Sequence, residues 1–381
     1  MTETLIPRSL KLRAGEWVEV RSKEEILSTL DKNAGLDEMP FMPEMFRFCG
    51  QRLRVSKRAH KTCDPVNGLE GRRMPNAVHL EGARCDGAAH DGCQAGCLFY
   101  WKEAWLKRVD QKAVDAPVNG SNSGSNGCTE QDVQAGTRVF AEPISSGDMT
   151  YICQATQVSR ATEPLRWWDL SQYVEDITSG NARLSQLFDA FVFFVYHNLA
   201  GAGLGLGTAM RWAYDVFQKM RGAPPYPWRM GKVAKGVRTP SAKLDVQVGD
   251  EVTIKDYSEI LETLDEDCKN RGMYFDAEMV PYTNGTFKVL KRVKRIIDEK
   301  TGKMLQLKNE AIILEDVVCQ ARYAKCRKLC PRAYYMYWRE IWLKKSSSAK
   351  LGSPQETTSL ARPEVDEDRL FRRKSWTQRS Q

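Results

Sequence analysis

The amino-acid sequence predicts an α+β fold in which two repeated small SH3-like β-barrels, each followed by a cysteine cluster and an aromatic helix, flank a helical insert. Three observations predict this arrangement. A segment near the N-terminus recurs in the C-terminal third, clustered cysteines follow both copies, and the chain between them has helical periodicity. The chain has 381 residues, 42% of them hydrophobic, so it is long enough for more than one domain with a buried core.

The repeat aligns without gaps at an offset of 234 residues, where "GEWVEVRSKEEILSTLD" from Gly15 matches "GDEVTIKDYSEILETLD" from Gly249. The same offset pairs Cys85 with Cys319. After an insertion the offset becomes 237, which aligns "WKEAWLK" at 101–107 with "WREIWLK" at 338–344. An ungapped similarity of this length indicates an internal duplication.

Within a copy, a β-rich run follows a glycine, and "EEILSTLD" at 24–31 then has helical spacing. Alternating apolar residues around Val55 predict a half-buried strand, and short strands between glycine turns are typical of a small barrel. Trp101 and Trp105 stand four residues apart, as do Trp338 and Trp342. That spacing predicts a helix whose aromatic face packs on its own barrel.

These features divide the chain into six segments. They are a flexible N-terminus (1–13), copy one (14–110), a flexible linker (111–137), a mainly helical insert (138–243), copy two (244–345) and a disordered tail (346–381).

One stretch of the insert, 190–210, has no formally charged side chain and is long enough to reach across a bilayer. His197 and a run of glycines make it a poor spanning helix. We therefore expect a buried helix that ends in a glycine loop, and membrane contact through 190–210 is the alternative.

Eleven cysteines in a chain whose first residues lack an apolar leader predict a cytoplasmic protein with reduced thiols. Copy one offers as metal ligands Cys63, Cys85, Cys93 and Cys97, with His90 as a spare ligand. Copy two offers Cys319, Cys326 and Cys330, and we expect Cys153 from the insert, ahead of Cys268, to complete that set. An open iron site with three cysteines is the alternative. Clustered thiolates bind zinc or an iron-sulfur cluster. The spacings match no common zinc knuckle or ferredoxin run, so the metal stays undetermined, and buried metal-free thiols are the alternative.

Other functional classes find little support. Lysine and arginine number 57 against 49 aspartates and glutamates, a net charge of +8, so we do not expect nucleic-acid binding, although the basic strands at 52–61 and 287–296 keep it as an alternative. No serine-histidine-acid order, HExxH helix or phosphate loop indicates a hydrolase or a nucleotide site. Whether the protein is an enzyme stays open.

Several segments, "EWVEVRSKEEILSTLD", "PFMPEMF", "YICQAT", "RWWDLSQYVED" and "YFDAEMVPY", together resemble a family of bacterial proteins of unassigned activity with a duplicated module, found beside polysaccharide and specialised-metabolite genes. The resemblance implies a biosynthetic context and no mechanism. We therefore expect a metal- or iron-sulfur-containing biosynthetic protein, either a redox enzyme or an accessory, with two cysteine-ligated sites and a redox or biosynthetic partner protein. The alternative is a zinc-stabilised or metal-free interaction scaffold that binds a protein or nucleic acid.

Overall fold

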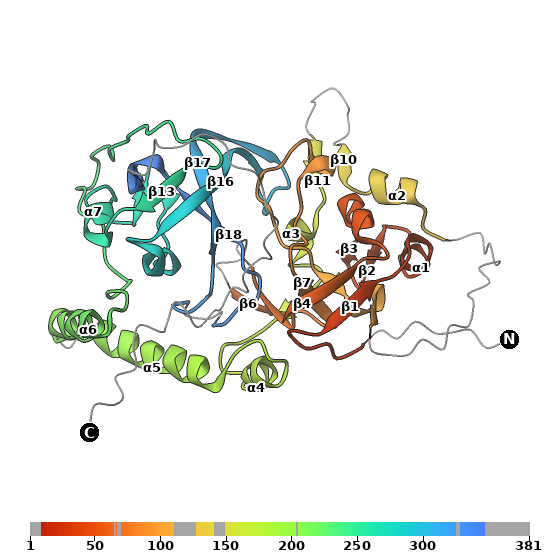
Figure 1. Ribbon diagram of the computed structural model, residues 1–381, viewed down its shortest axis with the longest axis horizontal. Coiled ribbons are helices and arrows are strands. Elements are labelled where there is room, and N and C mark those ends of the chain that lie inside the picture. Colours follow the sequence, from red (N-terminus) through yellow and green to blue (C-terminus); the bar gives the residue numbers. More distant parts are fainter. Residues whose placement is uncertain are drawn as a thin grey trace, which may run out of the picture.

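The computed structural model shows a mixed α/β protein with two β-rich halves and helices along one side (Figure 1). The structure describes residues 9–64, 66, 70–109, 127–140, 149–202, 205–324 and 328–346. Most of the predicted flexible N-terminus, linker and disordered tail therefore lies outside the described residues. The last part of the predicted linker is described and contains a helix, α2 (Glu130–Ala135).

The first half is built on a five-stranded antiparallel sheet of order β8-β7-β4-β1-β9. Its strands are β1 (Trp17–Val20), β4 (Arg52–Arg58), β7 (Ala77–Leu80), β8 (Trp101–Lys102) and β9 (Leu106–Arg108). Val18 and Val20 are fully buried whereas Trp17 is exposed, which is the alternation of a strand with one face on a core.

Shorter elements complete the first half and its edge. They are α1 (Lys23–Leu27), β2 (Gly35–Leu36), β3 (Met39–Pro40), β5 (Lys61–Asp64), β6 (Glu70–Arg73) and the 3-10 helices η1 (Pro43–Phe48), η2 (Ala88–His90) and η3 (Glu103–Trp105). Helix α1 begins at a capping box, in which the Ser22 side chain accepts from the Glu25 N–H and the Glu25 carboxylate accepts from the Ser22 N–H.

The second half has a sheet of the same arrangement, β18-β17-β16-β13-β19. Its strands are β13 (Glu251–Ile254), β16 (Thr286–Ile297), β17 (Met304–Val318), β18 (Tyr335–Trp338) and β19 (Leu343–Lys345). The smaller elements are α7 (Tyr257–Leu261), β14 (Lys269–Asn270), β15 (Met273–Tyr274), η5 (Ala277–Tyr282) and η6 (Glu340–Trp342). An offset of 234 residues carries β1 onto β13 and α1 onto α7. No sheet among the described strands closes on itself, so the predicted SH3-like barrels are not confirmed.

The prediction of an aromatic helix in each half is wrong. Each segment is a short strand, a 3-10 turn and a second short strand: β8, η3 and β9 in the first half, and β18, η6 and β19 in the second. The tight turn lets both tryptophans of a segment point into one core, and all four are fully buried. The indole N–H of Trp105 donates to the Thr29 hydroxyl at 3.1 Å, and that of Trp342 to Thr263 at 2.9 Å. The aromatic spacing thus reflected burial and not a helix.

The region between the halves combines short strands with helices. It contains β10 (Arg138–Phe140), β11 (Met149–Tyr151), α3 (Gln154–Gln157), β12 (Glu163–Pro164), α4 (Ser171–Thr178), α5 (Leu184–Gly201) and α6 (Gly207–Arg221). The Lys61 ammonium donates to the buried Asp176 carboxylate at 2.5 Å and ties α4 to the first half. The Phe193 ring of α5 lies 4.8 Å from Tyr323 of the second half. The helices therefore run beneath both halves (Figure 1).

The stretch 190–210 contains the end of α5 and the start of α6, and the expected buried helix is wrong for one face of it. Phe191, Val192, Val195, Leu199 and Leu206 are all exposed. Within the described part of the chain, no helix combines the length and the apolar character needed to cross a membrane.

Candidate metal centre

Four of the predicted cysteine ligands line one small enclosed cavity between the halves. Cys85, Cys93, Cys97 and Cys153 contribute to its wall together with His90, and the second half contributes Ile297, Arg332 and Tyr334. The cavity measures about 40 Å³. That space suits a metal ion or a few water molecules, whereas pockets for organic ligands usually exceed roughly 300 Å³.

The loop at 84–98 brings its cysteines together through local pairing. The Cys85 N–H donates to the Cys97 carbonyl at 2.8 Å, and Arg84 and Leu98 form an antiparallel bridge beside it. Gly87 has φ +80°, and a Cβ atom there would lie 2.0 Å from the Cys93 carbonyl oxygen. Only glycine fits this turn, which folds Cys93 back over the start of the loop.

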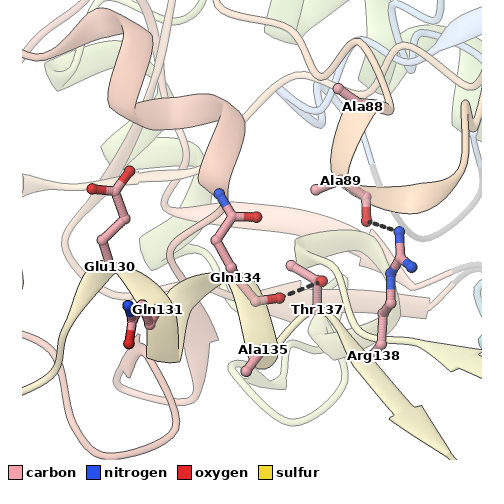
Figure 2. A pocket seen from close by; sticks show the side chains of 8 residues that line it. All are labelled: Ala88, Ala89, Glu130, Gln131, Gln134, Ala135, Thr137 and Arg138. Carbon is pink, nitrogen blue, oxygen red and sulfur yellow. Dashed lines mark hydrogen bonds between the residues drawn. The ribbon is translucent and has the colours of Figure 1, made fainter.

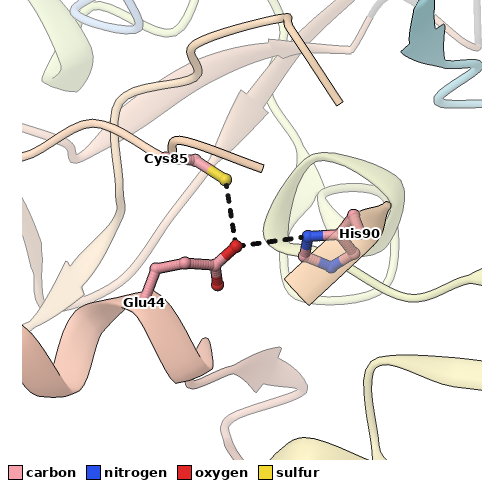
Figure 3. A group of neighbouring side chains, drawn as sticks. All are labelled: Glu44, Cys85 and His90. Atoms are coloured by element: carbon pink, nitrogen blue, oxygen red, sulfur yellow. Dashed lines mark hydrogen bonds and ion pairs between the residues drawn. The ribbon is translucent and has the colours of Figure 1, made fainter. Parts of the chain in front are cut away.

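Glu44, Cys85 and His90 form a group that could hold a metal ion, with ligand atoms all within 4.8 Å of one another (Figure 3). The Glu44 Oε1 atom lies 3.7 Å from the Cys85 sulfur and 3.5 Å from His90 Nδ1. Zinc bonds of 2.0–2.3 Å in a tetrahedron separate ligand atoms by about 3.3–3.8 Å. The two distances from Glu44 therefore match the separation of ligand atoms in a zinc site.

The Glu44 carboxylate has one oxygen in use and one without a partner. Oε1 accepts from the Ala89 N–H at 3.1 Å, while Oε2 is buried and has no hydrogen-bond partner among the described residues. Burial opposes ionisation of Glu44, but hydrogen bonds from His90 and the backbone outweigh it and leave the pKa below its ordinary value. A buried ionised oxygen without a partner points to a bound cation or water.

The second half has a glutamate at the aligned position, Glu278, that makes a useful comparison. Its Oε2 accepts from the Arg322 N–H at 2.9 Å, and its Oε1 accepts from the N–H groups of Tyr323 and Ala324 at 2.6 and 3.1 Å. Both glutamates thus anchor the loop that follows an aligned cysteine. Of the two glutamates, only Glu44 has a buried carboxylate oxygen without a partner among the described residues.

Burial controls the protonation of the cavity thiols. It raises the pKa of Cys97 to about 12 and that of Cys153 to about 11, and it raises the pKa of Cys85, with the Glu44 charge adding to the effect. Without a cation these thiols are protonated at neutral pH, and a bound metal would displace their protons. Cys93 instead accepts from the Ile297 N–H of β16 at 3.4 Å, which joins the loop to the second half.

The remaining predicted ligands form a second group. Cys63 packs in the core of the second half with Cys319 and Cys330, and the Cys330 thiol is hydrogen-bonded to that of Cys63. This bond, together with burial, raises the pKa of Cys330. Cys326 lies outside the described residues.

Two cysteines therefore lie in a different group from the one that the sequence predicted. Cys63 lies with the second set and not the first, whereas Cys153 lies with Cys85, Cys93 and Cys97 and not the second. The thiols share the cavity but do not converge on one point. In the described residues, Glu44, Cys85 and His90 form the only group of three or more such side chains within 4.8 Å of one another.

A larger hollow of about 650 Å³ lies on the surface beside the loop at 84–98, between α2, β10 and Ala88–Ala89 (Figure 2). Its charged side chains are engaged elsewhere. Glu130 pairs with Lys23 at 2.8 Å, and Arg138 pairs with Asp91 at 2.7 Å and donates to the Ala89 carbonyl at 3.4 Å. The hollow presents no catalytic arrangement.

Sequence reasoning missed Glu44. An acidic residue kept at aligned positions of both copies, within "PEMF" and "AEMV", was the signal that could have found it. Comparison with known proteins adds no name to this site, since no family model, curated protein or solved structure matches the chain.

Proposed function

We propose that the protein is a metal-stabilised interaction scaffold in which a zinc ion, held by Glu44, Cys85 and His90, fastens the loop at 84–98. The observation that carries the proposal is the grouping of the Glu44 carboxylate with a thiol and an imidazole, in which the second carboxylate oxygen, Oε2, is buried without a partner among the described residues. Cys97 and Cys153 are near enough to influence the Cys85 thiol electrostatically, and either could supply a fourth ligand. Glutamate, histidine and cysteine are all zinc ligands.

The mixed donor set favours zinc over an iron-sulfur cluster, because such clusters are held mainly by thiolates. The cavity volume of about 40 Å³ also suits a single ion. The four cysteines around the cavity support the second candidate, a redox protein with an iron-sulfur cluster. Both candidates fit an accessory in a biosynthetic context, as the sequence resemblance implies.

A structural role follows from what the site connects. Glu44 comes from η1, Cys85 and His90 from the loop, and Cys153 from the segment before α3, while Cys93 is bonded to β16. A metal that joins such distant segments makes its binding free energy part of the folding free energy. The repeated order of strands in the two sheets supports a duplicated module as the framework.

Metal analysis of the full chain, purified without oxygen, tests the proposal. We expect a colourless protein that contains zinc and loses one equivalent of it on Cys85→Ser. Cys49→Ser is the matched control, because Cys49 belongs to the first half but lies outside the cavity lining, and it should retain all the zinc. A brown protein that contains iron and sulfide would favour the second candidate, the iron-sulfur redox protein, over the zinc scaffold. A chain without metal, or a Cys85→Ser variant with full zinc content, would overturn the metal site.

A further inference from the structure

Helix α5 exposes an apolar stripe along its length. Leu184, Phe188, Val192, Val195 and Leu199 follow one another at intervals of three or four residues, so they lie on one face of the helix. All five are exposed, and the first two have 72% and 67% of their surface accessible. Contiguous exposed apolar surface of this kind usually marks a site of association.

Helix α6 exposes an apolar stripe of its own. Trp212, Val216 and Met220 stand four residues apart on one face, and Trp212 and Met220 are 67% and 76% exposed. Trp168 and Leu170, just before α4, are exposed as well. Exposed apolar side chains therefore occur along α5, along α6 and just before α4.

The opposite face of α5 is already packed, so the exposed stripe is not a second contact with the body of the protein. Phe193 lies against Tyr323 and Tyr214, with ring centres 4.8 and 6.0 Å apart. The Lys328 ammonium stands 4.2 Å from the centre of the Phe194 ring. A helix that is apolar on both faces and packed on one needs a second apolar environment for the other.

Basic side chains accompany the apolar surface. Lys219 and Arg221 flank Met220 and project about 100° to either side of it on the helix. Arg211 on α6 is exposed too, and Arg183 precedes α5. Among the acidic residues of these two fully described helices, Asp215 is paired with Arg229, which leaves Asp189 as the exposed acid.

We propose that the face formed by α5, α6 and the segment before α4 docks on an anionic lipid surface. Helices of this kind lie in the membrane interface, with the apolar face among the acyl chains, basic residues at the headgroups and tryptophans at the boundary. Symmetric pairing of two copies through this face would instead bring the basic rims together, and like charges oppose that. The proposal goes beyond the metal-stabilised scaffold and stands without it.

Co-sedimentation of the full chain with vesicles tests the docking. We expect binding to phosphatidylcholine vesicles that contain phosphatidylglycerol, little binding to phosphatidylcholine alone, and weaker binding at high salt. The double variant Lys219→Gln, Arg221→Gln should weaken binding about fivefold for each charge removed. The double variant Phe188→Asp, Trp212→Asp should abolish it.

Leu305→Asp is the matched control, because Leu305 is an exposed apolar residue of β17, away from the helices, and its replacement should leave binding unchanged. An unchanged melting temperature shows that each variant is folded. Three results would overturn the proposal: no vesicle binding, equal binding to neutral vesicles, or a dimer in light scattering that Phe188→Asp, Trp212→Asp dissociates without any effect of lipid.

Discussion

Replacing Glu44 and Glu278 separately by glutamine distinguishes a metal ligand from a loop anchor. The two residues occupy aligned positions, are almost fully buried, and hold equivalent loops. Glutamine keeps the shape of the side chain and one acceptor oxygen but removes the charge. The two substitutions should therefore have different costs, because the surroundings of the two carboxylates differ.

The magnitudes follow from the hydrogen bonds. Glu278 accepts three backbone N–H bonds, and in Glu278→Gln the amide NH₂ would face a donor, so the loss of a charge-assisted bond and the clash of donors should cost about 3 kcal/mol. In Glu44→Gln the amide oxygen can keep the Ala89 bond, and the NH₂ can take the place of the partnerless Oε2. Without metal that change should cost about 1 kcal/mol or less.

With zinc bound, Glu44→Gln should destabilise the protein more than Glu278→Gln does. Loss of a direct ligand should weaken zinc binding at least about 100-fold, since even outer partners of metal ligands contribute 10–100-fold. A 100-fold loss removes about 2.7 kcal/mol of ligand stabilisation. Glu44→Gln should therefore become the more zinc-dependent of the two variants, while the cost of Glu278→Gln should be the same with and without zinc.

Urea denaturation followed by tryptophan fluorescence, with zinc present and after treatment with a chelator, measures these costs. Zinc content of the purified variants gives an independent reading. If Glu44→Gln retained full zinc content and had equal cost in both conditions, Glu44 would be a loop anchor like Glu278. The proposed ligand set would then be refuted.

Other predictions concern the buried framework. Asp176→Asn should destabilise the protein by about 3–5 kcal/mol in urea denaturation, because it leaves the buried Lys61 ammonium without its partner at 2.5 Å. Burial lowers the pKa of His79 to about 4, below the unfolded value of about 6.5, so unfolding takes up a proton between these values. The free energy of unfolding should thus fall by roughly 3 kcal/mol from pH 7 to pH 4, and less in a His79→Leu variant. Trp105→Ala and Trp342→Ala should each lower stability by about 3–5 kcal/mol, whereas a loss of partner binding at unchanged melting temperature would contradict a purely structural role.

The sequence could predict burial better than backbone shape. The spacing of Trp101 and Trp105 showed that both face one core, but a 3-10 turn between two strands satisfies that spacing as well as a helix does. In α5, apolar residues all round the helix predicted burial, yet the packed face covers only half of it. Periodicity records which residues avoid water, and it cannot say whether the protein itself supplies the apolar environment.

The candidate metal centre was predictable in its cysteines and not in their grouping. We grouped Cys63 with the other cysteines of its own copy, because proximity along the chain was the available guide. In the structure, β5 carries Cys63 to the core of the second half, where the Arg332 guanidinium donates to its carbonyl at 3.0 Å. Contacts between the halves decide the grouping, and no local pattern encodes them.

The exchange of Cys63 and Cys153 has a simple explanation in the alignment of the copies. Position 297 of copy two corresponds to Cys63, and just as Cys63 contacts Cys330, Ile297 contacts Cys93, which is the residue aligned with Cys330. Each copy thus extends one strand residue into the cysteine set of the other. Copy two extends an isoleucine, so the set of the first half lacks a thiol at that point.

Cys153, which belongs to neither copy, lines the same cavity as Ile297 and supplies a thiol there. The first cavity therefore has a thiol from outside the two aligned segments, in addition to the three thiols of the loop at 84–98. A thiol in this wall could complete the proposed set of Glu44, Cys85 and His90, which has three ligands where tetrahedral zinc takes four. The same reciprocal contacts place the cavity between the halves, since Ile297 of the second half forms part of its wall and donates its N–H to Cys93.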